Sequence, residues 1–330
     1  MKPRVRHWVE KLQVRLAAVA AAVVGWCAIW QLMAPADKQA AWVFLPVGGY
    51  ARLAVFAGLV AALAAGCALA TLSGRAEGAL LATLTGVAAM SVRSGPMRTL
   101  LWQWEGRLGE LFAMLAVEML ALVGVLVAAV VVVHLLRMLA RPLCGDWFWA
   151  EPSAPAPEAD PTARRRGAVA DDRSARGSTP LARRLLWAGG FLAMELAVAM
   201  ILLVLTFRSQ ETGQIAFALA GSFFGAAFVA HLAFPVRSSI PAWLGPVLLG
   251  TVVYLLGAMS SFTGPGPVWH EAMMVAAKVP LRAALPVHWL GLGCGGAVAG
   301  FWASCRFRET PEEAKSAKQR QQRKAAPSRA

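Results

Sequence analysis

"FLAMELAVAMILLVL", residues 191–205, is a run of fifteen lipid-compatible side chains with one carboxylate, Glu195, near its middle. The run belongs to an apolar block that covers residues 185–207. Continuous apolar blocks of about 18 or more residues are typical of transmembrane helices, because ~20 residues rising ~1.5 Å each cross a ~30 Å hydrocarbon core. This stretch therefore predicts an α-helix that spans a lipid bilayer.

The rest of the chain repeats this pattern. Hydrophobic residues make up 58% of the 330 positions and charged residues only 15%, whereas about a quarter of the residues in soluble domains are charged. Further apolar blocks cover 16–34, 53–72, 78–93, 111–136, 214–234, 242–259 and 285–304. Because a backbone in lipid must satisfy its own hydrogen bonds, each block is expected to be helical. We predict an all-α, polytopic transmembrane helical bundle with eight spans. A re-entrant hairpin at the short block 78–93, leaving seven spans, is the alternative.

The positive charges are placed unevenly along the chain. With the N-terminus in the cytoplasm, eight spans put 24 of the 32 Lys and Arg residues in inner segments. Cytoplasmic segments of membrane proteins carry such an excess. We therefore expect a multi-pass protein of an inner membrane with both termini cytoplasmic. Many Ala residues and more Arg than Lys hint at a bacterial source. The net charge of +14 is explained by topology, so no nucleic-acid partner is expected.

The blocks divide into two four-helix membrane halves, residues 1–142 and 185–305. Residues 143–184 between them are rich in Pro, Ala, Arg and Asp, a composition typical of a disordered linker. The basic tail, residues 306–330, is expected to stay in the cytoplasm, where it can bind anionic lipid headgroups. Residues 1–36 resemble a cleaved signal peptide in ending with "APA", but their apolar stretch exceeds the usual ~7–15 residues. An uncleaved first helix is the preferred interpretation.

Glu195 is the main candidate for a functional side chain. It lies eleven residues from Arg184, roughly 16 Å along a helix and near the bilayer midplane. An ionised carboxylate there costs at least ~2.5–3.5 kcal/mol, so such residues usually face the bundle interior and mark a site. No Lys or Arg lies at that depth, so we expect a neutral acid that donates a hydrogen bond to Thr251 or Tyr254. Its role is either to hold helices together, which is the plainer interpretation, or to carry a proton or cation.

Glu118 is a second intramembrane acid. It lies nineteen residues from Arg137, ~28 Å along a helix, which places it near the outer interface. There we expect it to be hydrated and not paired with Glu195.

Glycines spaced four apart predict close contacts between helices, in the bundle interior or at a subunit interface. These glycines are Gly221 and Gly225, Gly291 and Gly295, and Gly296 and Gly300.

Catalytic and cofactor motifs are not found. The sequence has no phosphate-binding glycine loop and no nucleophile elbow, and its cysteines lack metal-site spacing. His270, Glu271 and His288 could form a three-ligand metal site on the outer side, but histidines beside Trp269 and Trp289 are also common in the aromatic belts of membrane proteins. We predict no catalytic residue, no cofactor and no metal.

The sequence therefore favours a non-enzymatic membrane subunit or scaffold with membrane-protein partners. A proton- or cation-coupled transporter that uses Glu195 is the alternative. A membrane enzyme with an outer-face metal site is a second alternative.

Overall fold

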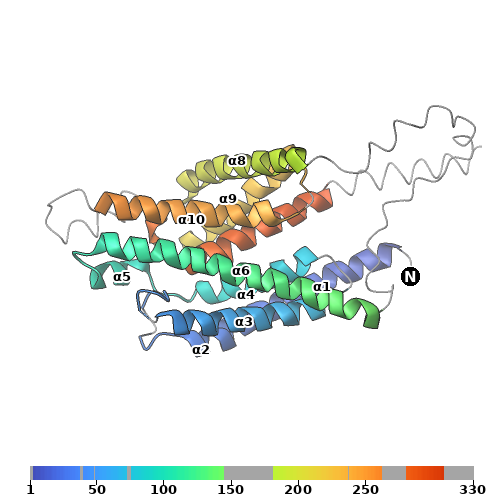
Figure 1. The fold of residues 1–330 in the computed structure, drawn as a ribbon, viewed down its shortest axis with the longest axis horizontal. Coiled ribbons are helices and arrows are strands. Elements are labelled where there is room, and N and C mark those ends of the chain that lie inside the picture. Colours follow the sequence, from blue (N-terminus) through green and yellow to red (C-terminus); the bar gives the residue numbers. More distant parts are fainter. Residues whose placement is uncertain are drawn as a thin grey trace, which may run out of the picture.

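The computed structural model describes residues 3–37, 40–47, 49–72, 76–144, 181–236, 238–261 and 280–307. Within these ranges every regular element is helical and no strand occurs (Figure 1). The N-terminal elements are α1 (Pro3–Val24), the π-helical turn η1 (Gly25–Ile29), α2 (Trp30–Met33), α3 (Gly49–Ala70), α4 (Ala76–Ser91), α5 (Met97–Gln103) and α6 (Leu108–Cys144). The C-terminal elements are α8 (Leu181–Thr206), α9 (Thr212–Ala233), α10 (Ile240–Ser261), η5 (Pro280–Ala283), α12 (Pro286–His288) and the π-helical turn η6 (Trp289–Gly293). The helix that comprises α12, η6 and residues 294–307 is called the last helix below.

Long apolar helices dominate the described part of the chain. Six of them are long and apolar enough to cross a membrane: Trp8–Met33, Gly49–Ala70, Leu108–Ala140, Leu185–Thr206, Thr212–Ala233 and Ile240–Met259. Their outward surfaces carry exposed side chains such as Leu16, Val55, Leu120 and Ile201, which suit contact with lipid. The prediction of a helical, multi-pass membrane bundle is confirmed.

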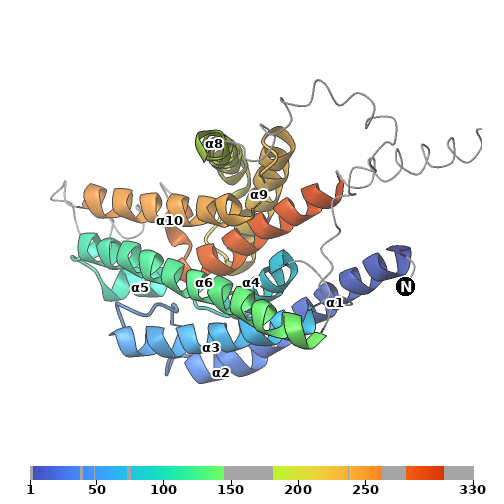
Figure 2. The ribbon, with the colours of Figure 1, turned by 45° about the vertical axis from the view of Figure 1, so that its right-hand side comes forward.

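The two ends of the bundle differ (Figures 1 and 2). The start of α1, the end of α6 and the end of the last helix lie together at one end, called the terminal end below. At the opposite end, called the cap end, α5 packs next to the start of α6, and residues 40–47 cover the helices there. Of the predicted linker 143–184, residues 145–180 lie outside the described residues, while its two ends belong to α6 and α8. The predicted tail 306–330 lies outside them beyond residue 307.

The short block of the sequence forms α4. This helix has 16 residues, or about 24 Å, less than the ~30 Å of a hydrocarbon core. It is one continuous helix in the middle of the bundle, where Gly78 touches Val14 of α1, and it is not a re-entrant hairpin (Figure 1). Ten of its residues are buried, among α1, α3, α6 and the last helix. Because α4 is enclosed by protein, its length does not have to match the bilayer.

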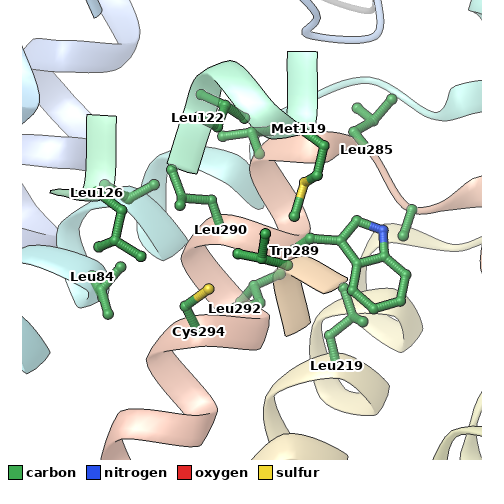
Figure 3. Packing of buried hydrophobic residues seen from close by; sticks show 14 of the residues in the cluster. Leu84, Met119, Leu122, Leu126, Leu219, Leu285, Trp289, Leu290, Leu292 and Cys294 are labelled. Carbon is green, nitrogen blue, oxygen red and sulfur yellow. The ribbon is translucent and has the colours of Figure 1, made fainter. Parts of the chain in front are cut away.

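The last helix packs between the two halves of the chain. A Cβ placed on Gly291 would lie 2.7 Å from the backbone of Ala88 in α4. On the other side, a Cβ on Gly296 would lie 2.4 Å from the carbonyl oxygen of Ala220 in α9. Trp289 fills the space at this junction, with Met119 of α6 on one side and Leu219 of α9 on the other (Figure 3). The two halves therefore share one hydrophobic core.

The remaining glycines differ in their surroundings. Gly300 makes the tightest contact, since a Cβ there would lie 2.1 Å from the carbonyl oxygen of Phe224. Gly225 faces the side chain of Leu202 at 3.2 Å, and Gly295 faces Leu84 at an ordinary 3.6 Å. Gly221 has nothing within 4 Å and lies open at the surface. Close packing thus requires glycine only at some of the predicted positions.

Candidate functional site

Glu195 points into the bundle from α8 and is fully buried. Its carboxyl group lies against Gly245 of α10, where a Cβ would be 2.7 Å from Oε2 and 2.8 Å from the carboxyl carbon. The absence of a side chain at Gly245 therefore makes room for the acid.

Neither carboxyl oxygen of Glu195 has a hydrogen-bond partner among the described residues. The predicted bond to Thr251 or Tyr254 is not formed. The Thr251 hydroxyl donates to the carbonyl of Val247 at 2.8 Å, one turn back in its own helix. The Tyr254 hydroxyl donates to the carbonyl of Ala284 at 2.5 Å.

The failure of that prediction has a geometric cause. The prediction counts the depth of Glu195 and of Thr251 from the start of each helix. It assumes that α8 and α10 begin at the same level in the bundle. Glu195 lies 14 residues after the start of α8, but it meets α10 at Gly245, only 5 residues after the start of that helix. Thr251 is therefore six residues further along α10, ~9 Å away by helical rise.

Two helix irregularities meet beside Glu195. Pro246 lies inside α10 and has no N–H, so the carbonyl of Ala242 lacks its usual intrahelical donor. The last helix carries the π-helical turn η6, which ends at Gly293 against Pro246, with a Cβ at Gly293 only 2.9 Å from the proline Cβ. Such π-helical turns are rare and often occur at functional sites.

Cys294 completes the surroundings of the acid. Its thiol is buried and donates at 3.3 Å to the carbonyl of Trp243, two residues before Gly245 in α10. Cys294 directly follows the π-helical turn η6 and lies on the last helix, as Figure 3 shows. We define the Glu195 site as Glu195, Gly245, Pro246, Cys294 and the backbone carbonyls of residues 242 and 243. In the sequence, Cys294 lies in an apolar block and has no metal-site spacing, so it gives no signal of its own. Only Pro246, a proline inside another apolar block, could have drawn attention to this position.

Glu118 is fully buried and is not the hydrated interfacial residue that the sequence suggests. Its Oε2 accepts hydrogen bonds from the backbone N–H groups of Phe44 at 2.9 Å and Leu45 at 3.0 Å. Residues 40–47 fold back over the cap end, and this fold brings the two N–H groups to the acid. Trp42 and Phe44 of the same segment pack on Phe56 of α3. Glu118 therefore anchors the cap.

His288 has a structural role. Its Nδ1 accepts the N–H of Leu285 at 3.1 Å, and its Nε2 donates to the carbonyl of Ser91 at 3.0 Å. Both ring nitrogens are used, so neither offers a lone pair to a metal. The other two metal candidates, His270 and Glu271, lie outside the described residues. Within the described part of the chain, no three His, Cys, Asp or Glu residues are grouped to hold a metal ion.

No protein family, curated protein or solved structure matches this chain. The function is therefore inferred from the geometry of the Glu195 site.

Proposed function

We propose that this chain is a membrane transporter that couples transport to a proton or cation through Glu195. The observation that carries the proposal is a fully buried carboxyl group whose two oxygens have no hydrogen-bond partner among the described residues. A polar group left unpaired in apolar surroundings costs free energy, so an acid that only holds helices together is expected to have a partner. An acid that takes up and releases an ion does not need a permanent hydrogen-bond partner.

The helix irregularities support the same proposal. Ion sites of secondary transporters lie where membrane helices are interrupted, because interrupted helices present backbone carbonyls to the ion. Here Pro246 removes one intrahelical hydrogen bond of α10, and the π-helical turn of the last helix ends against it. Both interruptions occur at the level of Glu195.

The bundle is closed around Glu195 in this conformation. The side chain has no exposed surface, so water does not reach it. For transport, α8 and α10 must separate at the Glu195–Gly245 contact to admit an ion from one side and release it to the other. The structure then corresponds to an occluded state between these two openings.

The proposal includes a topology of eight spans with both termini in the cytoplasm of a bacterial inner membrane. It is supported by the beginning of α1 and the end of the last helix, which lie at the same end of the bundle (Figure 1). An even number of crossings has this result. The concentration of Lys and Arg in the segments assigned to that side supports its cytoplasmic location.

A non-enzymatic membrane subunit or scaffold is the second candidate. The observation that favours it is the same closed packing, because a rigid bundle that excludes water suits a structural subunit. In that case Glu195 serves packing, and membrane-protein partners bind the lipid-facing surface. The basic tail would bind anionic lipid headgroups under either function.

The deciding experiment measures charge movement in proteoliposomes on a solid-supported membrane. A jump in pH or in Na⁺ or K⁺ concentration moves charge when an ion binds a buried acid, even before a substrate is known. We expect a transient current from the wild-type protein and none from Glu195→Gln. Glu118→Gln is the matched control and should retain the current, since Glu118 already accepts two backbone N–H groups.

Folding is checked by size-exclusion chromatography and thermal unfolding of each variant. A wild-type protein that gives no current, or a Glu195→Gln variant that gives the full current, would contradict the transport proposal. Co-purification of stoichiometric partners in nanodiscs, unchanged in Glu195→Gln, would then identify the scaffold.

A further inference from the structure

The Glu195 site contains too few oxygen ligands for a metal cation. Hard cations bound by proteins take about six to eight oxygens, from carboxylates, carbonyls and waters. The site offers the two carboxyl oxygens and the carbonyls of Ala242 and Trp243, and the second carbonyl already accepts the thiol of Cys294. The hydroxyls of Thr251 and Tyr254 lie outside the site, since neither forms a hydrogen bond with the Glu195 oxygens.

The site also lacks space for a hydrated cation. Glu195 has no surface accessible to water, and its carboxyl group fills the position that a Cβ of Gly245 would occupy. Waters therefore cannot supply the missing ligands in this conformation. A proton, in contrast, needs no coordination shell and no extra volume.

The charges around Glu195 lead to the same conclusion. Its helix packs against α9 and α10, whose titratable side chains are His231 and Tyr254. His231 forms hydrogen bonds with the Ser304 hydroxyl and the Val236 carbonyl, and it forms none with the Glu195 oxygens. From the last helix, the Cys294 thiol donates to the carbonyl of Trp243 in α10.

Arg306, also of the last helix, lies at the terminal end in an ion pair with Glu10. The described residues thus place no cationic side chain within hydrogen-bonding reach of the Glu195 oxygens.

We infer that the ion carried by Glu195 is a proton and that metal cations are excluded from this site. The inference rests on the proposed transport function. The closed structure corresponds to the protonated acid, Glu195–COOH, because the neutral form suits apolar surroundings. Loss of the proton leaves a bare carboxylate there, which disfavours the closed state and favours opening of the bundle to water. Release of the proton is thereby coupled to the conformational change.

Infrared spectroscopy of the full-length protein in lipid tests this inference. A protonated carboxyl group has a C=O stretching band that a carboxylate lacks, and the band of Glu195 is assigned by its loss in Glu195→Gln. We expect the band to disappear as the pH is raised and to be unaffected by Na⁺, K⁺ or Mg²⁺ at fixed pH. Glu118→Gln identifies any band from the other buried acid.

A second variant protects the assignment if Glu195→Gln does not fold. Cys294→Ser replaces the neighbouring thiol with a hydroxyl group and should shift the same band while Glu195 is retained. Loss of the band on addition of Na⁺ or K⁺ at fixed pH would overturn the proton assignment and leave transport intact. A band that persists at every pH and in every salt would show that Glu195 does not exchange an ion, and both proposals would fail.

Discussion

Replacing Gly300 by Ala should separate the last helix from α9. A Cβ at this position would lie 2.1 Å from the carbonyl oxygen of Phe224 and 2.9 Å from its carbonyl carbon, whereas real Cβ contacts essentially never fall below 3.0 Å. The helices must therefore move apart by about 0.9 Å. Both sides of this contact are helix backbone, so no side-chain rotation can relieve it.

The cost follows from the type of contact. Extra atoms in a well-packed interior typically cost about 1–3 kcal/mol. The movement also loosens the contact at Gly296, one turn earlier, where a Cβ would lie 2.4 Å from the Ala220 carbonyl. We therefore expect a loss near the upper end, about 3 kcal/mol, or roughly a hundredfold in the unfolding equilibrium.

The matched control is Gly221→Ala in α9, a position with nothing within 4 Å. Alanine is the better helix former, by about 1 kcal/mol in soluble helices, so this variant should be unchanged or slightly more stable. Unfolding in mixed detergent micelles can be followed by the fluorescence of the chain's 13 tryptophans. Equal unfolding midpoints for Gly300→Ala and Gly221→Ala would refute the proposed helix contact.

Three further predictions concern polar contacts. Glu118→Leu leaves the N–H groups of Phe44 and Leu45 unpaired, of which the buried one at Phe44 costs about 1–3 kcal/mol. Hydrogen exchange in residues 40–47 should therefore be faster than in Glu118→Gln, which keeps an acceptor. Equal exchange in the two variants would contradict the role of Glu118 as an anchor. His288→Phe removes two hydrogen bonds to backbone groups and should lower the free energy of unfolding by about 1–3 kcal/mol. A chelator should leave the melting temperature of the wild type unchanged, and a lower melting temperature would indicate a bound metal. Glu10→Gln breaks the partly exposed ion pair with Arg306. In chemical unfolding it should lower the free energy of unfolding by less than about 1 kcal/mol, as is usual for exposed ion pairs. A larger loss would show that this ion pair stabilises the fold more than an exposed pair does.

The helices could be predicted because each is encoded by its own apolar run. The block 53–72 becomes α3 (Gly49–Ala70), and the block 214–234 becomes α9 (Thr212–Ala233). In lipid the local sequence is sufficient, since a backbone there has few alternatives to the helix. The burial of Glu195 could also be predicted, because a carboxyl group within an apolar run is expected to face the bundle interior and not the lipid.

The partners of the two acids could not be predicted in this way. Glu118 accepts hydrogen bonds from N–H groups of a segment more than 70 residues away in sequence. The sequence of residues 40–47 gives no signal that this segment folds inward. Glu195 meets Gly245 because α8 and α10 are shifted along their axes relative to each other. Axial shifts and π-helical turns are set by packing across several helices, so a single sequence does not reveal them.

The position of the last helix has a consequence for synthesis. The bundle can close around α4 only when the ribosome has made residues 286–307, whose backbone lies against Ala88. Translation at about 5–20 residues per second needs about 10–40 s for the roughly 200 residues between α4 and this helix. During this interval one face of α4, a helix too short to match the bilayer alone, is not covered by the last helix. We therefore expect a stop codon just before the last helix to disturb the packing of the first half of the chain as well as that of the second.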